Sequence, residues 1–290
     1  MTGDRKTISE MVRDKFDDLT RAERQLVDAI LRNYPVSGLG SITALAQSAD
    51  VSTPTVGRLV QKLGFHGYPA FQAALRAELE EQLSSPLVKH DRWSDGAPDT
   101  HILNRFADAA VDNLRQTLGQ IDPADFDAAC ALLAGLERRI FAVGGRITHA
   151  LADYFCTHMQ VIRDRVIPLA ANSNTWPHYL LSMRPGDVLV VFDIRRYEND
   201  ILKLAEMAAD NGTEIVLFTD QWGSPVAPLA RHRFNCRIEA PSVWDSSAAT
   251  VVILETLIAG VQQRNWDTTR DRMKAIEDLF DRTRLFRKFN

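Results

Sequence analysis

The segment from Ser41 to Phe65, SITALAQSADVSTPTVGRLVQKLGF, constrains the fold of this chain more than any other feature. Its apolar period breaks at Ala49-Asp50-Val51, which predicts two short helices around a tight turn. In the second half, apolar residues recur at i, i+3, i+4 and i+7, namely at Val56, Leu59, Val60 and Leu63. Such a pair is typical of the helix-turn-helix unit, whose second helix lies in the major groove of DNA.

The second helix of this pair has a clear start signal. Ser52 or Thr53 can cap it, and Pro54 suits a first turn, where an early N–H needs no intrahelical partner. Its N-terminal residues should lie nearest the base edges, while basic side chains reach guanine or phosphate. The side chains expected on its exposed, DNA-facing side are Thr53, Thr55, Arg58, Gln61 and Lys62.

The charges around this helix agree with a double-stranded DNA operator as the partner. Between Val51 and Arg76 the chain has three cations, Arg58, Lys62 and Arg76, and no Asp or Glu, although the formal net charge of the whole chain is -4. A local basic stretch on an acidic protein is the pattern expected for phosphate contact. The alternative is an ordinary helical hairpin with a solvated basic face.

Length and composition allow two domains and exclude several protein classes. The chain has 290 residues, of which 45% are hydrophobic and 25% charged, as in ordinary globular proteins. No apolar run approaches the ~20 residues of a membrane helix, and the polar start MTGDRKTISE is not a signal peptide. The 3 cysteines lack CxxC spacing, so we expect no disulfide framework, no metal site and no cofactor, and a cytoplasmic location.

The first part of the chain should be helical. Thr20 and Glu23 form a capping-box pattern that opens a helix through about Asn33. A further helix is expected from Tyr68 to Leu83, followed by a segment of linker composition. We therefore predict a helix-turn-helix domain at residues 1–83, a linker at 84–100 and a second domain at 101–290.

The pattern of the second domain predicts a three-layer α/β fold around a parallel sheet. The expected strands are short and nearly continuously apolar, and they run from Arg139 to Val143, Val161 to Leu169, Asp187 to Phe192, Glu214 to Phe218 and Arg233 to Ile238. Two helices are expected before the first strand, at 101–119 and from Asp122-Pro123 onward, and one after it, ending at about Gln160. Further helices are expected at 174–183, 198–211, 224–231, 247–263 and 267–284. Parallel sheets covered on both faces have such strands, and they bind ligands at the strands' carboxyl ends.

Both parts resemble the RpiR family of bacterial transcription regulators. The first part carries the resemblance in Leu45-Ala46, Val51 to Val56, Arg58, Lys62 to Phe65, Gly67-Tyr68 and Phe71. The second part resembles a SIS (sugar isomerase) domain in Val143 to Gly145, Val188 to Phe192, Phe218 to Asp220, Ser224-Pro225, Ala227, Ala230 and Asp245 to Ser247. The resemblance implies a regulator that binds DNA through one domain and senses phosphosugars or related metabolites through the other.

Two loops depart from the usual SIS pattern. Arg146 stands where the second glycine of a Gly-x-Gly-x-Ser turn is expected, and Thr148 stands where the serine is expected. After the strand that ends at Phe192, the usual Ser-x-Ser-Gly-x-Thr loop is replaced by residues 193–198, DIRRYE. The hydroxyl-lined phosphate cradle is therefore lost, which leaves the usual phosphosugar ligand in doubt.

The arginines of these loops predict an anionic effector. A cation near a helix N-terminus is electrostatically misplaced unless an anion binds there, and arginine suits phosphate and carboxylate groups. The alternative is structural pairing with Asp193, Glu198 or Asp200, and for Ser246 a capping role. The expected effector-binding residues are Gly144, Gly145, Arg146, Thr148, Asp193, Arg195, Arg196, Tyr197, Ser246 and Ser247.

Two further patterns concern catalysis and metal binding. Glu255 has apolar neighbours at helical spacing, which would raise its pKa and suit the base of a sugar-phosphate isomerase. No second acid or base group has a readable place, so we expect no enzyme activity and no catalytic residue. His149, Asp153 and Cys156 share a helical face, but no fourth metal ligand is evident.

The interpretation is a DNA-binding regulator whose SIS-like domain senses a small anionic metabolite, a phosphosugar or a sugar acid. Because such regulators bind two-fold operators, we expect a homodimer or a dimer of dimers, with no membrane partner. A sugar-phosphate isomerase with an accessory helical domain, and an interaction module without a ligand, are the alternatives. The sequence leaves open the operator, the effector and whether the effector releases or tightens DNA.

Overall fold

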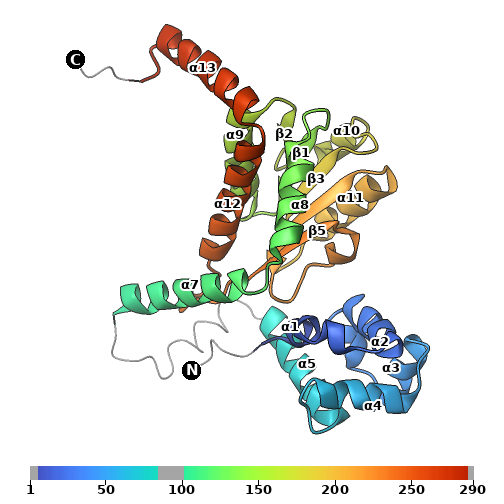
Figure 1. Cartoon of the computed structure of the whole chain (residues 1–290). Coiled ribbons are helices and arrows are strands. Elements are labelled where there is room, and N and C mark those ends of the chain that lie inside the picture. The colour runs from blue at the N-terminus through green and yellow to red at the C-terminus, as the bar shows by residue number, and fades with distance from the viewer. Residues whose placement is uncertain (1–5, 84–100, 287–290) are drawn as a thin grey trace. The chain divides into compact units, whose positions relative to one another are not determined.

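The computed structural model describes residues 6–83 and 101–286, and the predicted linker at 84–100 lies outside them (Figure 1). The chain forms two compact units that interleave along the sequence. The first unit comprises Met1–Gln120, Thr219–Pro228 and Asn235–Ala249. The second unit comprises Ile121–Phe218, Leu229–Phe234 and Thr250–Asn290.

The first unit is built largely from helices. Their bounds are α1 (Ile8–Asp14), α2 (Arg21–Leu31), α3 (Ile42–Ser48), α4 (Thr53–Lys62), α5 (Tyr68–Leu83) and α7 (Ile102–Leu118). The capping box predicted at Thr20 and Glu23 is confirmed, and a second one, formed by Thr7 and Glu10, opens α1. Both boxes satisfy backbone donors that a helix start would otherwise leave unpaired.

Helices α3 and α4 are the two predicted helices of the helix-turn-helix unit. Ser41 caps α3 by accepting a hydrogen bond of 3.1 Å from the backbone N of Ala44. Asp50 adopts a φ of 49° in the turn between the helices, a left-handed conformation that Asp tolerates better than most residues. The apolar face predicted for α4 is confirmed, because its four members are all buried in one core with α1, α2 and α5: Val56, Leu59, Val60 and Leu63.

A carboxylate lies against this helical core. Glu78, on α5, accepts a hydrogen bond from the hydroxyl of Tyr34 and another, of 2.8 Å, from the backbone N of Ile8. Burial, together with the smaller effects of the neighbouring Glu10 and Glu81, raises the pKa of Glu78 to about 7, although the two hydrogen bonds oppose the shift. Glu78 therefore retains its proton in the folded state at pH values where an unfolded chain loses it.

We expect the free energy of unfolding to fall as the pH rises from about 4.5 through 7, since the folded state then holds a proton that the unfolded state has released. Glu78→Gln removes this titration. Over the same pH interval, the free energy of unfolding should therefore fall by up to about 3 kcal/mol less in the variant than in the wild type. Urea unfolding at several pH values measures the difference. Parallel pH profiles for the two proteins would contradict the assignment.

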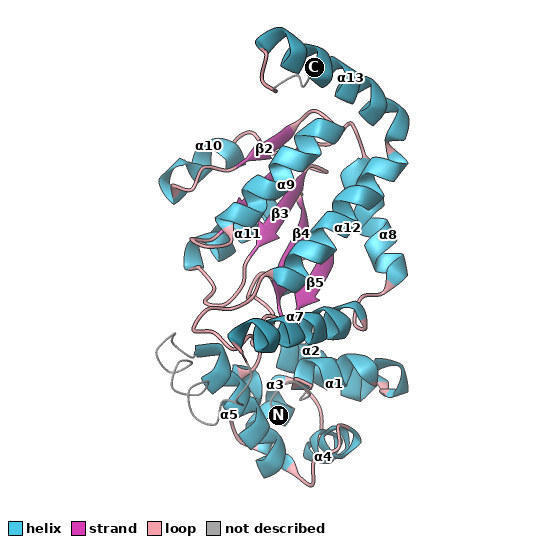
Figure 2. Ribbon diagram, turned by 90° about the vertical axis from the view of Figure 1, so that its left-hand side faces the viewer, coloured by secondary structure: helices cyan, strands magenta, loops and turns pink. Residues whose placement is uncertain are grey.

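The sheet has five strands in the order β2-β1-β3-β4-β5 (Figure 2). Their bounds are β1 (Ile140–Gly144), β2 (Val166–Pro168), β3 (Val188–Phe192), β4 (Glu214–Asp220) and β5 (His232–Cys236). β1 pairs in parallel with β2 and β3, and β3 pairs in parallel with β4. Every residue of β1 and β3 is buried, which explains the continuous apolar strands of the sequence.

Helices cover both faces of this sheet, which confirms the predicted three-layer α/β class (Figure 2). Their bounds are α8 (Pro123–Ala134), α9 (His149–Ile162), α10 (Trp176–Leu180), α11 (Asn199–Asp210) and α12 (Ala248–Arg264). The last helix, α13 (Trp266–Thr283), packs against α9 and extends beyond the sheet (Figure 2). Two local predictions are wrong. The strand predicted from Val161 is shorter because α9 continues to Ile162, and the helix predicted at 224–231 is a single 3-10 turn, since Pro225 and Pro228 remove two backbone donors.

Candidate functional site

The exposed side of α4 is the candidate DNA-binding surface. Thr53, Arg58 and Gln61 are exposed, as predicted from the helical period. The guanidinium of Arg58 donates a hydrogen bond of 3.1 Å to Oγ1 of Thr55. One side chain that can read guanine therefore projects from the middle of the helix with a defined orientation.

Thr55 does not belong to this exposed side, so its predicted exposure is wrong. It is 4% exposed, because it lies four residues before the buried Leu59 and so on the same face of the helix. Its hydroxyl also shares a hydrogen bond of 2.9 Å with Oγ of Ser52, whose side chain does not cap the backbone. In this structure Thr55 orients Arg58 from inside the domain.

Lys62 is engaged within its own domain. Its Nζ lies 2.7 Å from Oε2 of Glu23 and donates to the carbonyl of Asp18 at 3.1 Å. Burial alone would raise the pKa of Glu23, but hydrogen bonds from Lys62 and Thr20 outweigh it and hold that pKa below its usual value. The ammonium expected to reach DNA thus stabilises the capping box of α2.

The second candidate site lies at the carboxyl edge of the sheet, where β1 and β3 end side by side. Gly144 is in register with Phe192, so the loops 145–148 and 193–198 leave the sheet next to each other. The hydroxyl of Thr148 joins them, since it accepts from the backbone N of Gly145 at 2.8 Å and donates to the carbonyl of Phe192 at 2.7 Å. Thr148 was predicted as an effector ligand, and here it ties the two loops together.

The turn after β1 is closed by backbone at Gly144 and by a side chain at Gly145. A Cβ at Gly144 would lie 2.4 Å from the carbonyl oxygen of Thr148, and one at Gly145 would lie 2.6 Å from Oε1 of Glu198. Glu198 also accepts a hydrogen bond of 2.8 Å from the backbone N of Arg146. From the sequence, Glu198 was expected only as an alternative ion-pair partner, whereas here its carboxylate links the two loops.

Gly144→Ala should therefore destabilise the protein, by about 1–3 kcal/mol, because the new methyl group meets backbone that cannot move aside. Gly57→Ala is the matched control, since a Cβ at Gly57 on α4 meets nothing within 4 Å. That change should be neutral or stabilise the helix by about 0.5–1 kcal/mol. Urea unfolding measures both, and equal effects would refute the tight turn.

The guanidinium groups of this edge differ in their surroundings. Arg146 and Arg196 are exposed, and among residues 6–83 and 101–286 neither guanidinium has a hydrogen-bond or ion-pair partner. Structural pairing of these two arginines is therefore not observed. Arg195 and Tyr197 are half-buried and each has an interaction partner, while the buried Asp193 accepts a long contact of 3.5 Å from the backbone N of Glu198.

Ser246 and Ser247 belong to the first unit. Ser246 is buried, and its Oγ accepts a hydrogen bond of 3.3 Å from the backbone N of Ala248, the first residue of α12. The capping role considered for Ser246 is thus present. Ser247 is half-buried beside it.

The prediction that Glu255 lies in apolar surroundings is wrong. Glu255 is exposed on α12 and accepts a hydrogen bond of 2.6 Å from the hydroxyl of Tyr154. The helix buries a different face, and two of the apolar neighbours of Glu255, Val252 and Ala259, are exposed like Glu255 itself. The surroundings of Glu255 are therefore not the buried apolar ones on which the isomerase alternative depended.

The face that carries His149, Asp153 and Cys156 does not form a metal site. Nε2 of His149 lies 3.6 Å from Oδ2 of Asp153, and Cys156 is buried, which raises the pKa of its thiol to about 12. Within the part of the chain that the structure describes, no group of three His, Cys, Asp or Glu residues is arranged to hold a metal ion. None of its helices is long and apolar enough to cross a membrane either.

A helix-turn-helix unit joined to a parallel α/β domain defines the class of this protein as a DNA-binding transcription regulator. Residues 6–82 match the helix-turn-helix domain of the rpiR family, and residues 136–261 match the SIS domain. Together the two matches span most of the chain. The chain therefore belongs to the RpiR family of transcription regulators.

Individual proteins agree with this assignment. The transcriptional regulator HexR of Pseudomonas aeruginosa is 26% identical over 96% of this chain and 97% of its own length. The sugar isomerase domain of an RpiR transcription factor from Sphaerobacter thermophilus has a TM-score of 0.57 at 21% identity, covering 62% of this chain and 99% of that one. The Vibrio vulnificus NanR protein complexed with ManNAc-6P has a TM-score of 0.56 at 18% identity, covering 97% and 99%.

Proposed function

We propose that the carboxyl edge of the sheet binds a small anionic metabolite, and that this binding changes the affinity of α4 for an operator. The observation that carries the proposal is the pair of exposed guanidinium groups, Arg146 and Arg196, beside a glycine turn at the ends of two neighbouring parallel strands. Parallel sheets bind ligands at this edge, and unpaired arginines there favour an anion.

The chemistry of the edge indicates which anions to consider. NanR, a protein of the same fold, has a solved structure in complex with ManNAc-6P, a phosphosugar. In this chain the serine loop is replaced by DIRRYE, so recognition would depend on arginine forks, which match a planar carboxylate as well as a phosphate. Phosphosugars and sugar acids are thus both candidate effectors. Gly144, Gly145 and Thr148 would shape the turn that receives the anion, and Asp193, Arg195 and Tyr197 would form the opposite loop.

Regulation rather than catalysis suits this edge. A sugar-phosphate isomerase needs a positioned base, and the one carboxylate considered for that role, Glu255, is exposed and bonded to Tyr154. The relatives that match along the whole chain are named as transcription regulators. We therefore propose a protein without enzyme activity, acting in the cytoplasm where its operator lies.

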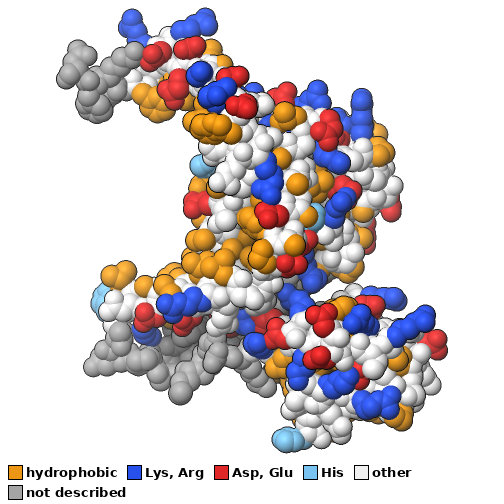
Figure 3. Space-filling model, in the orientation of Figure 1, with side chains coloured by type: hydrophobic (Ala, Val, Ile, Leu, Met, Phe, Trp, Pro, Cys, Tyr) orange, Lys and Arg blue, Asp and Glu red, His pale blue; other side chains and the backbone are white. Residues whose placement is uncertain are grey.

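We also propose that the protein works as a homodimer or a dimer of dimers. An operator with two half-sites requires two recognition helices, and each chain supplies one. The helix α7 offers surface for such an assembly, because it carries exposed apolar residues (Figure 3). These are Ile102, Leu103, Phe106, Val111 and Leu118.

A ligand screen tests the effector proposal. ManNAc-6P, gluconate, glucuronate and inorganic phosphate, each with neutral mannose as a control, are titrated into the full chain while its melting temperature is recorded. A ligand that binds only the folded state raises that temperature, and the rise grows with the logarithm of its concentration once that exceeds Kd. A shift with at least one of the anionic sugars supports the proposal. Equal shifts with mannose and with the anions would contradict an anion site.

A further inference from the structure

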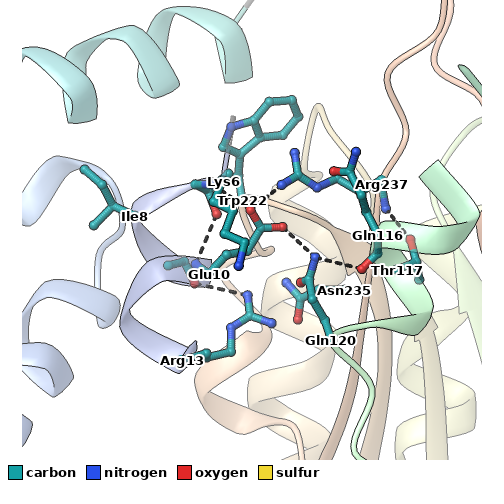
Figure 4. A network of polar contacts seen from close by, with 12 residues as sticks. Lys6, Ile8, Glu10, Arg13, Gln116, Thr117, Gln120, Trp222, Asn235 and Arg237 are labelled. Carbon is teal, nitrogen blue, oxygen red and sulfur yellow. Dashed lines mark hydrogen bonds and ion pairs between the residues drawn. The ribbon is translucent and has the colours of Figure 1, made fainter. Parts of the chain in front are cut away.

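A buried ion pair joins two distant segments of the first unit (Figure 4). Glu10, on α1, is 3% exposed, and Arg237, the first residue after β5, is 5% exposed. The guanidinium of Arg237 donates to Oε2 of Glu10, across 227 positions of sequence. Nothing in the local sequence pattern of either segment indicates this contact.

Both oxygens of Glu10 are engaged. Oε2 also accepts from the backbone N of Thr7 at 2.6 Å, as part of the capping box that opens α1. Oε1 accepts from Nε2 of Gln120 at 2.7 Å, and Gln120 follows the C-terminal end of α7. One carboxylate thus holds together the start of α1, the end of α7 and the segment after β5.

Arg237 belongs to a segment that is hydrogen-bonded on two sides. Its backbone N donates to Oγ1 of Thr117 on α7 at 2.9 Å, and the carbonyl of Glu239 accepts from Nδ2 of Asn113 at 2.7 Å. Between them, the carbonyl of Ile238 accepts from the backbone N of Ser246 at 2.8 Å. Residues 237–239 therefore connect α1 and α7 with Ser246, which precedes α12 and was predicted to contact the effector.

The energetics of such a buried pair indicate that it fixes the positions of the segments it joins more than it stabilises the fold. The cost of desolvating two charges offsets most of their attraction, whereas removing one partner leaves a buried charge unpaired. The network also holds buried atoms that lack a hydrogen bond, namely the donors Nε of Arg13 and Nε of Arg237 and the acceptor Oε1 of Gln120. A second arrangement of the same side chains can therefore form hydrogen bonds between these donors and this acceptor.

We propose that the Glu10–Arg237 pair is the latch that couples effector binding to the DNA-binding helices. The inference rests on the proposed function, since it assigns the coupling between the two proposed sites. Helix α1 shares a core with α4, because Ile8 and Val12 are buried in one cluster with Val56 and Leu59. Arg237 directly follows β5, a strand of the sheet at whose carboxyl edge the effector is proposed to bind. Opening or closing the pair shifts α1, and with it the orientation of α4.

The test compares operator affinity with and without effector in three variants of the full chain. The probe is ManNAc-6P or gluconate, whichever changes the operator affinity of the wild type. In Glu10→Gln, which keeps the shape and a hydrogen-bonding amide, the ratio of the two affinities should fall toward one, while probe affinity by calorimetry stays within about twofold. Asp14→Asn is the control, because Asp14 lies on the same helix in an exposed ion pair with Lys6, and its ratio should equal that of the wild type.

Arg237→Lys tests the same ion pair from its other side, in case Glu10→Gln does not fold. It retains the positive charge beside Glu10 but loses the guanidinium fork, so it should fold and show a reduced ratio. A folded Glu10→Gln or Arg237→Lys protein with the full wild-type ratio would overturn the latch and leave the proposed function intact. A wild type whose operator affinity responds to neither probe would instead contradict the proposed function itself.

Discussion

Replacing Arg58 with alanine is expected to weaken operator binding by about 1–3 kcal/mol, which is roughly a five- to hundredfold rise in Kd. Arg58 is exposed on α4, and its guanidinium is oriented by Thr55, so its loss removes a directed contact without opening the core. Fluorescence anisotropy on a labelled fragment upstream of the protein's own gene measures the change. If Arg58 contacts only phosphate, the salt dependence of binding should also fall by about one unit.

Arg32→Ala is the matched control for this experiment. Arg32 is an exposed arginine at the C-terminal end of α2, so its replacement changes the net charge equally but leaves α4 intact. The control should bind the operator nearly as the wild type does at the same salt concentration. If Arg58→Ala behaved like Arg32→Ala, α4 would not be the helix that reads DNA.

The double variant Arg146→Ala/Arg196→Ala should lose effector affinity by more than a hundredfold. A hydrogen bond to a charged group contributes about 1.5–3 kcal/mol, and two guanidinium groups would be removed together. Both side chains are exposed and unpaired among the described residues, so the fold and the basal DNA affinity should persist. Calorimetry with the anionic sugar that emerges from the ligand screen measures the loss.

Arg282→Ala provides the comparison, since Arg282 is an exposed arginine on α13 in the same unit. It removes one positive charge from the second unit without touching the sheet edge, and effector affinity should remain within about twofold if long-range attraction is screened by salt. Should the double variant bind the anion as tightly as Arg282→Ala does, the arginines of the edge would not be its ligands.

The spacing of apolar residues predicted the helices and strands that are buried in a core. The four apolar residues of α4 from Val56 to Leu63 are spaced so that only a helix brings them to one core, and β1 and β3 are continuously apolar because both faces of the sheet are covered. The capping box of Thr20 and Glu23 was also predictable, because its two residues interact within one helical turn.

Periodicity could not predict the partners of polar side chains. It placed Lys62 on an outer face, but Glu23, 39 positions earlier, is brought beside it only by the packing of α2. It could not show that Glu198 supports the turn after β1, because that contact depends on the pairing of β1 with β3. The pair of Glu10 and Arg237 lies still further apart in sequence, so tertiary structure alone reveals it.

In the proposed mechanism, an anionic metabolite at the arginine-bearing edge of the sheet controls operator binding. The most direct test is operator affinity, by anisotropy, for the wild type and Arg146→Ala/Arg196→Ala, with and without ManNAc-6P or gluconate. We predict that at least one anion changes the wild-type Kd by about fivefold or more, in the range usual for allosteric coupling, and that the double variant does not respond. Equal responses in the two proteins, or a wild type whose operator affinity changes with neither anion, would contradict this proposal.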